Sequence, residues 1–237
     1  MRWKELARSV KHWLLDRKIS YSQTGEDLIA GFYLSGLKKG FYVDIGANDP
    51  MHLNNTYFFY KRGWRGICVE PDAEKVNLIK LRRPKDTVIQ AGVGDRPGVM
   101  PFYVFDPDTV STFSSVEKQK YQNLGYTFIG EQQVKIQTLE QIFRENLNGQ
   151  HIDILSIDTE GQDFEVLKSN DWQKFRPTLV IVEVIEHCGN FGLRQARRFD
   201  EFMSSKDYVK FADTNINALY LEKSFAEAKK ITSIANS

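Results

Sequence analysis

Phe41-Tyr42-Val43-Asp44-Ile45-Gly46-Ala47-Asn48-Asp49-Pro50 is the stretch of this chain that decides its fold. It predicts an apolar strand, residues 41–45, that leads through a glycine turn into a helix. A second apolar stretch, residues 66–70, ends at Glu70. In an α/β sheet, a turn of this kind after one strand and an acid after the next build a nucleoside site, in which the acid binds ribose hydroxyls.

The residues of the turn indicate which nucleoside cofactor fits. Gly46 is its glycine, Asn48 tolerates left-handed backbone geometry, and Asp49 and Pro50 are typical of a helix N-cap and first helical residue. A carboxylate at the N-cap would occupy N–H groups that a phosphate needs and would repel the phosphate. The turn therefore favours a cationic cofactor without phosphates, such as S-adenosylmethionine, over the dinucleotide of an NAD-dependent oxidoreductase. An ordinary strand-turn-helix corner is the structural alternative.

The composition is that of one globular α/β domain that does not bind nucleic acid. The chain has 237 residues, of which 41% are hydrophobic, enough to bury a large core. Its 32 basic and 31 acidic residues give a formal net charge of +1, so no overall field attracts a polyanion. Cys68 and Cys188 lie in or beside predicted strands without metal-ligand spacing. We expect them to be reduced core thiols of a cytoplasmic protein.

The segment from Arg2 to Lys18 predicts a basic amphipathic helix. Its apolar face carries Trp3 and Trp13, and lysines and arginines populate the rest of its surface. Such a helix either packs on its own domain or makes peripheral contact with an anionic membrane. We therefore divide the chain into this helix at residues 1–20, a main domain at residues 21–223 and a polar tail at residues 224–237.

Strands and helices alternate along the main domain. Strands are predicted at residues 41–45, 66–70, 87–91, 99–105, 134–137, 152–157, 178–185, 208–212 and 217–221, and helices at 26–37, 53–61, 73–81, 139–147, 164–169 and 194–204. This alternation predicts an α/β fold with a mostly parallel sheet, helices on both faces and an antiparallel C-terminal strand pair. Residues 106–130 fit no regular pattern, which in a compact domain marks a functional or mobile segment.

Ligands of such sheets bind beyond the carboxyl ends of the strands. Five predicted strand ends carry polar or glycine groups, namely Asp44 to Asn48, Glu70 to Asp72, Ala91 to Gly94, Asp158 to Gly161 and Glu183 to His187. Glu183 continues a strongly apolar strand, so its carboxyl group needs a partner, either in a functional site or on a structural arginine. Asp158 alternatively caps the next helix, and His187 alternatively lies on the surface.

Four motifs, in this order, resemble the FkbM-type S-adenosylmethionine-dependent methyltransferases. They are Ser22-Gln23-Thr24-Gly25-Glu26-Asp27, Val43-Asp44-Ile45-Gly46-Ala47-Asn48, Val69-Glu70-Pro71 and Ser156-Ile157-Asp158-Thr159-Glu160-Gly161. The match runs from about Tyr21 to Leu221. The resemblance implies a class I methyltransferase fold, which is Rossmann-like, and O-methylation of a sugar, glycan or other hydroxylated metabolite.

The resemblance also implies a role for each motif. Asp44, Gly46 and Asn48 would line the methionine end of the cofactor, Glu70 would bind its ribose, and Gly92, Val93 and Gly94 would border its adenine. Ser22, Gln23, Glu26 and Asp27 would cover the cofactor from the N-terminal side. Asp158 and Glu160 would face the site of methyl transfer.

Methyl transfer to a hydroxyl group requires an aligned oxygen and benefits from a base within hydrogen-bond reach. Asp158, Glu160 and His187 are the candidates. Asp158 has the best-supported place, and His187 is the alternate because imidazole titrates near neutral pH. Together with Glu183, these groups alternatively hold a divalent metal ion that orients a diol, although we expect no metal.

Aromatic residues gather in the irregular segment and just before it. They are Tyr103, Phe105, Phe113, Tyr121, Tyr126 and Phe128. They either shape a pocket for a small-molecule or glycan acceptor or pack on the core as a lid. A last functional alternative is a non-catalytic, methyltransferase-like module that binds a partner through the basic helix.

Overall fold

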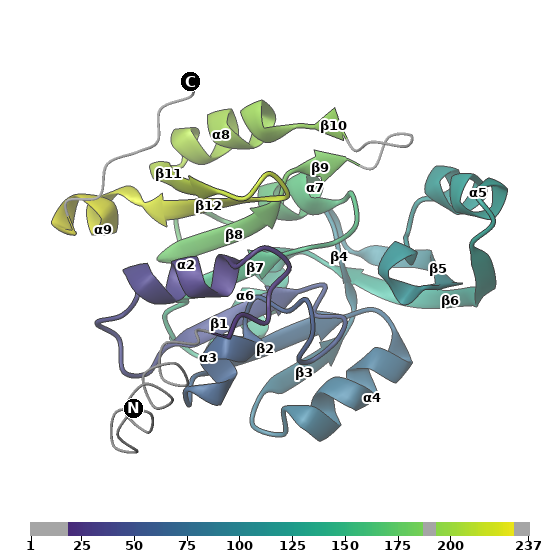
Figure 1. Ribbon diagram of the computed structural model, residues 1–237, viewed down its shortest axis with the longest axis horizontal. Coiled ribbons are helices and arrows are strands. Elements are labelled where there is room, and N and C mark those ends of the chain that lie inside the picture. The colour runs from purple at the N-terminus through teal and green to yellow at the C-terminus, as the bar shows by residue number, and fades with distance from the viewer. Residues whose placement is uncertain (1–18, 187–192, 230–237) are drawn as a thin grey trace, which may run out of the picture.

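A seven-stranded sheet forms the centre of the molecule, in the order β11-β12-β8-β7-β1-β2-β3 (Figure 1). The computed structural model describes residues 19–186 and 193–229. The strands of this sheet are β1 (Phe41–Ile45), β2 (Arg65–Glu70), β3 (Thr87–Gln90), β7 (Ile154–Ile157), β8 (Leu179–Glu183), β11 (Tyr208–Asp213) and β12 (Asn217–Glu222). Their bounds agree with the predicted strands to within a few residues.

The pairing directions confirm the predicted mostly parallel sheet. β1 pairs in parallel with β2 and β7, and β2–β3 and β7–β8 are parallel as well. β12 is antiparallel to both β8 and β11, which gives the expected C-terminal antiparallel pair. Because β1 and β7 are neighbours although the chain places them far apart, the ends of β1, β2 and β7 meet at one edge of the sheet.

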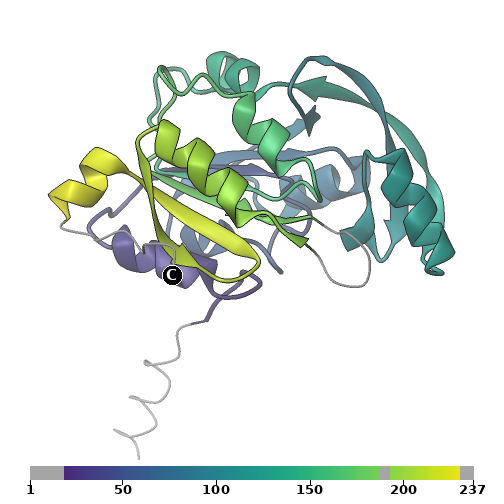
Figure 2. The same ribbon diagram turned by 90° about the horizontal axis from the view of Figure 1, so that it is seen from above.

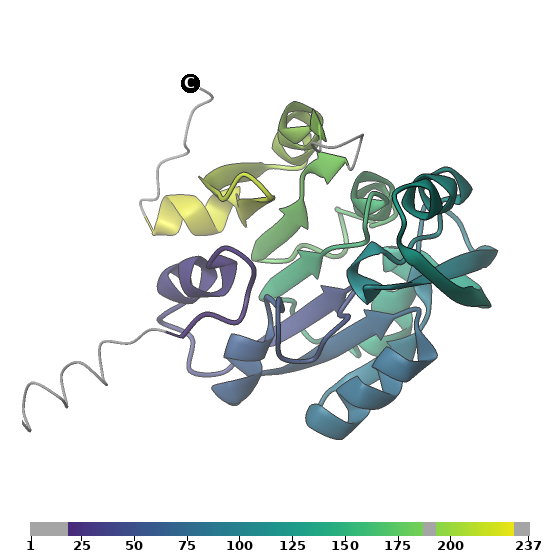
Figure 3. The same ribbon diagram turned by 45° about the vertical axis from the view of Figure 1, so that its right-hand side comes forward.

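Helices cover both faces of the sheet, as predicted (Figure 3). Side chains alternate between the faces along each strand, so Val43 packs in one core and Tyr42 in the other. The first core includes α6 (Leu139–Asn146), α7 (Asp163–Lys168) and α8 (Ala196–Ser205). The second includes α2 (Glu26–Tyr33), α3 (Tyr57–Lys61) and α9 (Lys223–Ala228), and α4 (Ala73–Arg82) packs through Ile79 on Cys68 of β2.

The segment that lacked a regular pattern folds into a separate layer, here called the β5–β6 unit (residues 98–137). It comprises β5 (Gly98–Asp106), the short 3-10 helix η1 (Asp108–Val110), α5 (Ser115–Asn123) and β6 (Thr127–Gln137), and β4 (Gly92–Val93) joins its sheet beside β6. The unit projects from the end of the molecule opposite α9 (Figures 1 and 2). Tyr103, Phe105, Tyr121 and Phe128 form its own small core.

Several expectations need correction. No helix begins at Asp49 and Pro50 in the described chain, because the first helix after β1 is α3, which starts at Tyr57. The polar tail begins with α9, whose Ala226 is buried.

Cys68 is a free buried thiol, as expected. The N-terminal amphipathic segment, His187 and Cys188 lie outside the described residues. Among the residues that are described, no helix has the length and apolar character to cross a bilayer.

Candidate active site

A cavity of about 450 Å³ opens at the carboxyl ends of β1, β2 and β7, where the sheet meets the β5–β6 unit. Of the residues predicted from sequence, those that line it are Gln23, Gly46, Asn48, Glu70, Gly92, Val93, Asp158 and Glu160. Its lining also includes Asp49, Asp72 and Asp108, and its basic members are Lys75 and His52. A site rich in carboxylates suits a cationic ligand better than a polyphosphate.

Gly46 is the position where only glycine fits. Its backbone is left-handed, with φ of 76°, and a Cβ atom there would lie 1.7 Å from the carbonyl oxygen of Asp158. The crowding arises because Asp158 continues β7 directly beside the end of β1 and donates its N–H to Ile45 O at 3.0 Å. Gly46 therefore lets the backbones of two strand ends approach each other at the cavity wall.

Glu70 ends β2 and binds the loop after β1. Its Oε2 accepts the N–H of Asn48 at 2.9 Å, and its Oε1 accepts the N–H of Asp72 at 2.9 Å. Burial raises the pKa of Glu70 to about 7, although these two hydrogen bonds and Lys75 lower it. Each carboxylate oxygen can accept a further hydrogen bond, so the group is suited to a pair of ribose hydroxyls.

Asp49 occupies backbone donors without capping a helix. Its Oδ1 accepts the N–H groups of Met51 and His52, each at 2.8 Å, in a turn. The predicted helix is absent from this part of the described chain, but the predicted consequence remains. The carboxylate of Asp49 accepts these backbone N–H groups at the cavity rim, so they are not available to a phosphate.

The end of β7 carries an acidic cluster. Carboxylate oxygens of Asp158, Asp163 and Glu183 lie within 4.8 Å of one another. Burial, followed by the charges of Glu160 and Asp163, raises the pKa of Asp158 well above its usual range. Burial and then Asp158 raise the pKa of Glu183 to about 11. Glu183 therefore keeps its proton at neutral pH, which leaves one negative charge fewer beside Asp158. The raised pKa also makes the ionised form of Asp158 a stronger base.

Asp163 shapes the loop that presents the acids. Its Oδ1 accepts the N–H of Thr159 at 2.8 Å and the hydroxyl of Thr159 at 3.1 Å, and its Oδ2 accepts the N–H of Gly161 at 3.2 Å. Glu160, between them, has a left-handed backbone with φ of 52°. Of the metal-binding group proposed from sequence, the structure brings Asp158 and Glu183 together, and Asp163 takes the third place. Both carboxylate oxygens of Asp163 also accept hydrogen bonds from this loop.

Asp44 lies behind the loop and does not line the cavity, so its predicted contact with the cofactor stays a prediction. Its Oδ2 accepts the side-chain N–H of Asn54 at 3.1 Å and the hydroxyl of Thr56 at 2.6 Å, and Arg83 Nη1 lies 3.7 Å away. Strand alternation explains this, because Asp44 shares the face of Tyr42 and Cys68 that packs on α3 and α4. Burial raises the pKa of Asp44, while Arg83, Thr56 and Asn54 lower it.

Glu26 and Asp27 are also structural, whereas Gln23 from the same motif lines the cavity. Both acids are fully buried. Glu26 Oε1 accepts from Thr214 Oγ1 and Asn217 Nδ2, each at 2.8 Å, and so joins α2 to the β11–β12 turn. Asp27 accepts the N–H of Tyr21 at 2.7 Å and holds the chain before α2. Neither carboxylate lines the cavity, and the predicted contact of both with the cofactor stays a prediction.

The β5–β6 unit contributes further cavity residues, of which Phe113 was already a candidate for the acceptor pocket from sequence. Phe102, Asp108, Thr109, Ser111 and Phe113 line the cavity, and the rings of Phe102 and Phe113 lie 4.8 Å apart. An ion pair between Lys75 of α4 and Asp108 of η1 crosses the cavity mouth. Of the six aromatic residues considered from sequence, Phe113 lines the cavity, whereas Tyr103, Phe105, Tyr121 and Phe128 pack within the unit.

The fold and the cavity together describe a class I methyltransferase. The methyltransferase FkbM domain model matches residues 44–210, which is most of the chain. The chain belongs to this family, and it is a methyltransferase that uses S-adenosylmethionine. The family match replaces the NAD-dependent oxidoreductase as a description of the domain.

The chain is also similar to solved structures at low sequence identity. A TehB-like SAM-dependent methyltransferase from Corynebacterium glutamicum has 9% identity and a TM-score of 0.45, with 93% of this chain and 97% of that chain covered. A putative O-methyltransferase from Klebsiella pneumoniae has 11% identity and a TM-score of 0.41, with 87% and 82% covered. An O-methyltransferase from Bacillus cereus in complex with SAH has 13% identity and a TM-score of 0.36, with 91% and 87% covered. A search of curated protein sequences gave no match.

Proposed function

We propose that the enzyme transfers the methyl group to a hydroxyl oxygen of a sugar, glycan or other hydroxylated metabolite. The observation that carries this proposal is the position of Asp158 and Glu160 in the wall of the cavity that Gly46, Asn48 and Glu70 also line. A hydroxyl group must lose its proton when its oxygen is methylated, and a carboxylate beside the acceptor can take that proton.

The roles divide between the two sides of the cavity. S-adenosylmethionine supplies a methyl group on a positively charged sulfur, which becomes neutral when an acceptor oxygen bonds to the methyl carbon. Glu70 binds the ribose, Gly92 and Val93 border the adenine, and the acidic wall favours the positive charge of the bound cofactor. Asp158 accepts the proton of the acceptor hydroxyl at a carboxylate oxygen, and Glu160 helps to orient the acceptor. His187 stays a predicted alternate base outside the described residues.

The walls contributed by the β5–β6 unit support an acceptor with both apolar and polar surfaces. Phe102 and Phe113 offer aromatic faces, and Ser111 and Thr109 offer hydroxyl groups. Sugar rings present the same combination of C–H faces and hydroxyl groups. We also predict that the enzyme is cytoplasmic and that residues 2–18 make peripheral contact with a membrane.

The experiment is a screen of acceptors with S-adenosylmethionine that carries a labelled methyl group. Panels of sugars and other polyols, of amines and of carboxylic acids are compared, and each labelled product is analysed for the atom that carries the methyl group. The proposal expects label on an oxygen of a hydroxylated acceptor. Label found on nitrogen alone, with the polyol panel unlabelled, would contradict it while leaving the methyltransferase assignment intact.

A further inference from the structure

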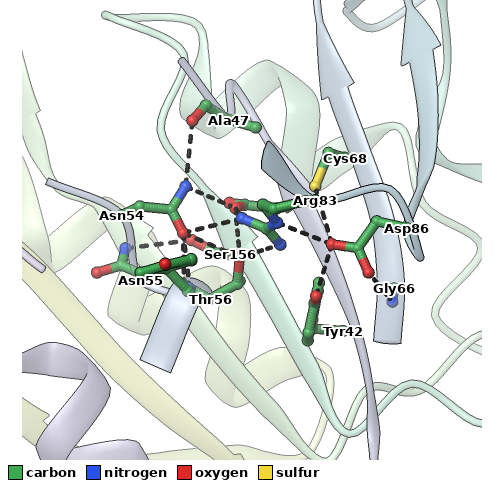
Figure 4. Close-up of polar contacts among 12 residues, drawn as sticks. Tyr42, Ala47, Asn54, Asn55, Thr56, Gly66, Cys68, Arg83, Asp86 and Ser156 are labelled. Atoms are coloured by element: carbon green, nitrogen blue, oxygen red, sulfur yellow. Dashed lines mark hydrogen bonds and ion pairs between the residues drawn. The ribbon is translucent and has the colours of Figure 1, made fainter. Parts of the chain in front are cut away.

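The cofactor loop, residues 46–49, is fixed by hydrogen bonds from two directions. On one side, Gly46 and Ala47 donate their N–H groups to Val69 O at 2.9 and 3.2 Å, and Asn48 donates to Glu70. On the other side lies Asn54, a buried residue that does not line the cavity. Its Nδ2 donates to Ala47 O at 3.1 Å (Figure 4). The same nitrogen donates to Asp49 O at 3.2 Å.

These two carbonyl groups flank Asn48, whose backbone is left-handed with φ of 41°. A left-handed conformation costs free energy for a residue with a side chain, although least for asparagine, so hydrogen bonds on both sides help to hold it. One side-chain amide that binds the carbonyl before and the carbonyl after Asn48 enforces it directly. Asn54 thereby determines how Gly46 and Asn48 face the cavity.

The orientation of the Asn54 amide is itself fixed by donors. Its Oδ1 accepts the N–H groups of Thr56 at 3.0 Å and Tyr57 at 2.8 Å, and it accepts Arg83 Nη1 at 3.2 Å. Arg83 is fully buried and is held in turn by Asp86, whose Oδ2 lies 2.8 Å from Nε (Figure 4). Because three donors converge on the oxygen, the nitrogen must face the loop.

We propose that Asn54 is a positioning residue for S-adenosylmethionine. It holds the cofactor loop in the conformation that binds the cofactor, and it does not contact the cofactor itself. The two ends of its amide have separate tasks. The oxygen holds the start of α3 and receives Arg83, whereas the nitrogen holds the cofactor loop and lies 3.1 Å from Asp44 Oδ2 as well. This inference rests on the assignment of S-adenosylmethionine as the cofactor, and it predicts that the nitrogen can be removed with a specific loss of cofactor affinity.

The test is Asn54→Asp, which keeps the shape and the acceptor oxygen but replaces the donor nitrogen by a carboxylate oxygen. The neighbour Asn55 provides a matched control, since it is also buried and its Nδ2 donates to Ser156 Oγ at 3.1 Å, away from the loop. The dissociation constant of S-adenosylhomocysteine is measured by calorimetry for the wild type, Asn54→Asp and Asn55→Asp, and the melting temperature of each is measured alongside. We expect Asn54→Asp to raise the constant at least ~10-fold and Asn55→Asp to leave it within about twofold, whatever both do to stability.

A second variant covers the case in which Asn54→Asp does not fold. Asn54→Ser keeps a short acceptor for the Thr56 N–H but cannot reach the carbonyl groups of Ala47 and Asp49, and the same loss of affinity is expected. Unchanged affinity in whichever Asn54 variant folds, or an equal loss in Asn55→Asp, would overturn the positioning role. Failure of the wild type to bind S-adenosylhomocysteine would instead contradict the cofactor assignment.

Discussion

Two buried polar clusters lie beside the cofactor loop, and they differ in charge balance. On the face that packs on α3 and α4, Arg83 pairs with Asp86 (Figure 4) and with Asp44, so one cation offsets part of the charge of two acids, and we call this group the balanced cluster. At the ends of β7 and β8, three carboxyl groups, those of Asp158, Asp163 and Glu183, crowd together. A balanced cluster keeps its charges and fixes geometry, whereas an acid-rich cluster holds protons that it can exchange. The first cluster thus supports the site, and the second is equipped for its chemistry.

Removing the cation from the balanced cluster should have the largest effect. Arg83→Met leaves two buried carboxylates without their shared partner, and loss of one member of such a group costs about 3–5 kcal/mol. The free energy of unfolding, measured by urea denaturation, should fall by this amount. The adjacent Arg82 is exposed, so Arg82→Met should change it by less than about 0.5 kcal/mol. Equal changes in the free energy of unfolding for Arg83→Met and Arg82→Met would show that the buried ion pairs do not stabilise the fold.

Neutralising the acid at the cavity should affect turnover, not folding. Asp158→Asn removes the proposed base, and we expect methyl transfer to slow by at least ~100-fold while the affinity for S-adenosylhomocysteine stays the same. Asp153 precedes the other end of β7, where its Oδ2 accepts the N–H of Phe41 at 2.8 Å. Asp153→Asn should therefore retain turnover. Normal turnover in Asp158→Asn would remove this residue from the mechanism.

The sequence predicted the bounds of the strands better than it predicted where their side chains point. Strand periodicity located β1 and β2 within one residue, because apolar runs ending at an acid are read directly from the chain. The motif does not reveal that the face of Asp44 packs on Arg83, which is distant in sequence. The burial of Glu26 is hidden for the same reason, since its partner Asn217 lies near the other end of the chain.

The β5–β6 unit was the least predictable part of the fold. α5 has a polar sequence in which Tyr121 is its buried residue, so no apolar period reveals the helix. β6 alternates exposed and half-buried residues over its first part because only one face is covered. The cavity residues of this unit, such as Phe102 and Asp108, depend on how it folds back onto the sheet, which local patterns do not specify.

The acid-rich cluster should also make stability depend on pH. The pKa of Glu183 is raised to about 11, chiefly by burial and then by Asp158, so the folded protein keeps a proton that the unfolded chain releases above its ordinary pKa of 4.5. The free energy of unfolding therefore falls as the pH rises above 4.5, and Glu183 contributes up to about 1.4 kcal/mol per pH unit to this fall. Glu183→Gln is neutral in both states and should flatten the curve of unfolding free energy between about pH 6 and pH 7 by that amount. Parallel curves for wild type and variant would mean that Glu183 is ionised in the folded protein.

Glu70 belongs to neither cluster. Its titration should have the smallest effect of those predicted here, and that effect should be confined to the affinity for the cofactor. Its carboxylate is held by the N–H groups of Asn48 and Asp72, and burial raises its pKa to about 7. The ionised form is the better acceptor for ribose hydroxyls, so cofactor binding favours proton release and strengthens as pH rises through 7. The dissociation constant of S-adenosylhomocysteine should fall by about fivefold to tenfold between about pH 6 and pH 8. Glu70→Gln should bind more weakly at the upper end of this range and lose the pH dependence. If the variant kept the same pH profile, the titrating group would lie elsewhere, and the acid-rich cluster at β7 would be the next group to examine.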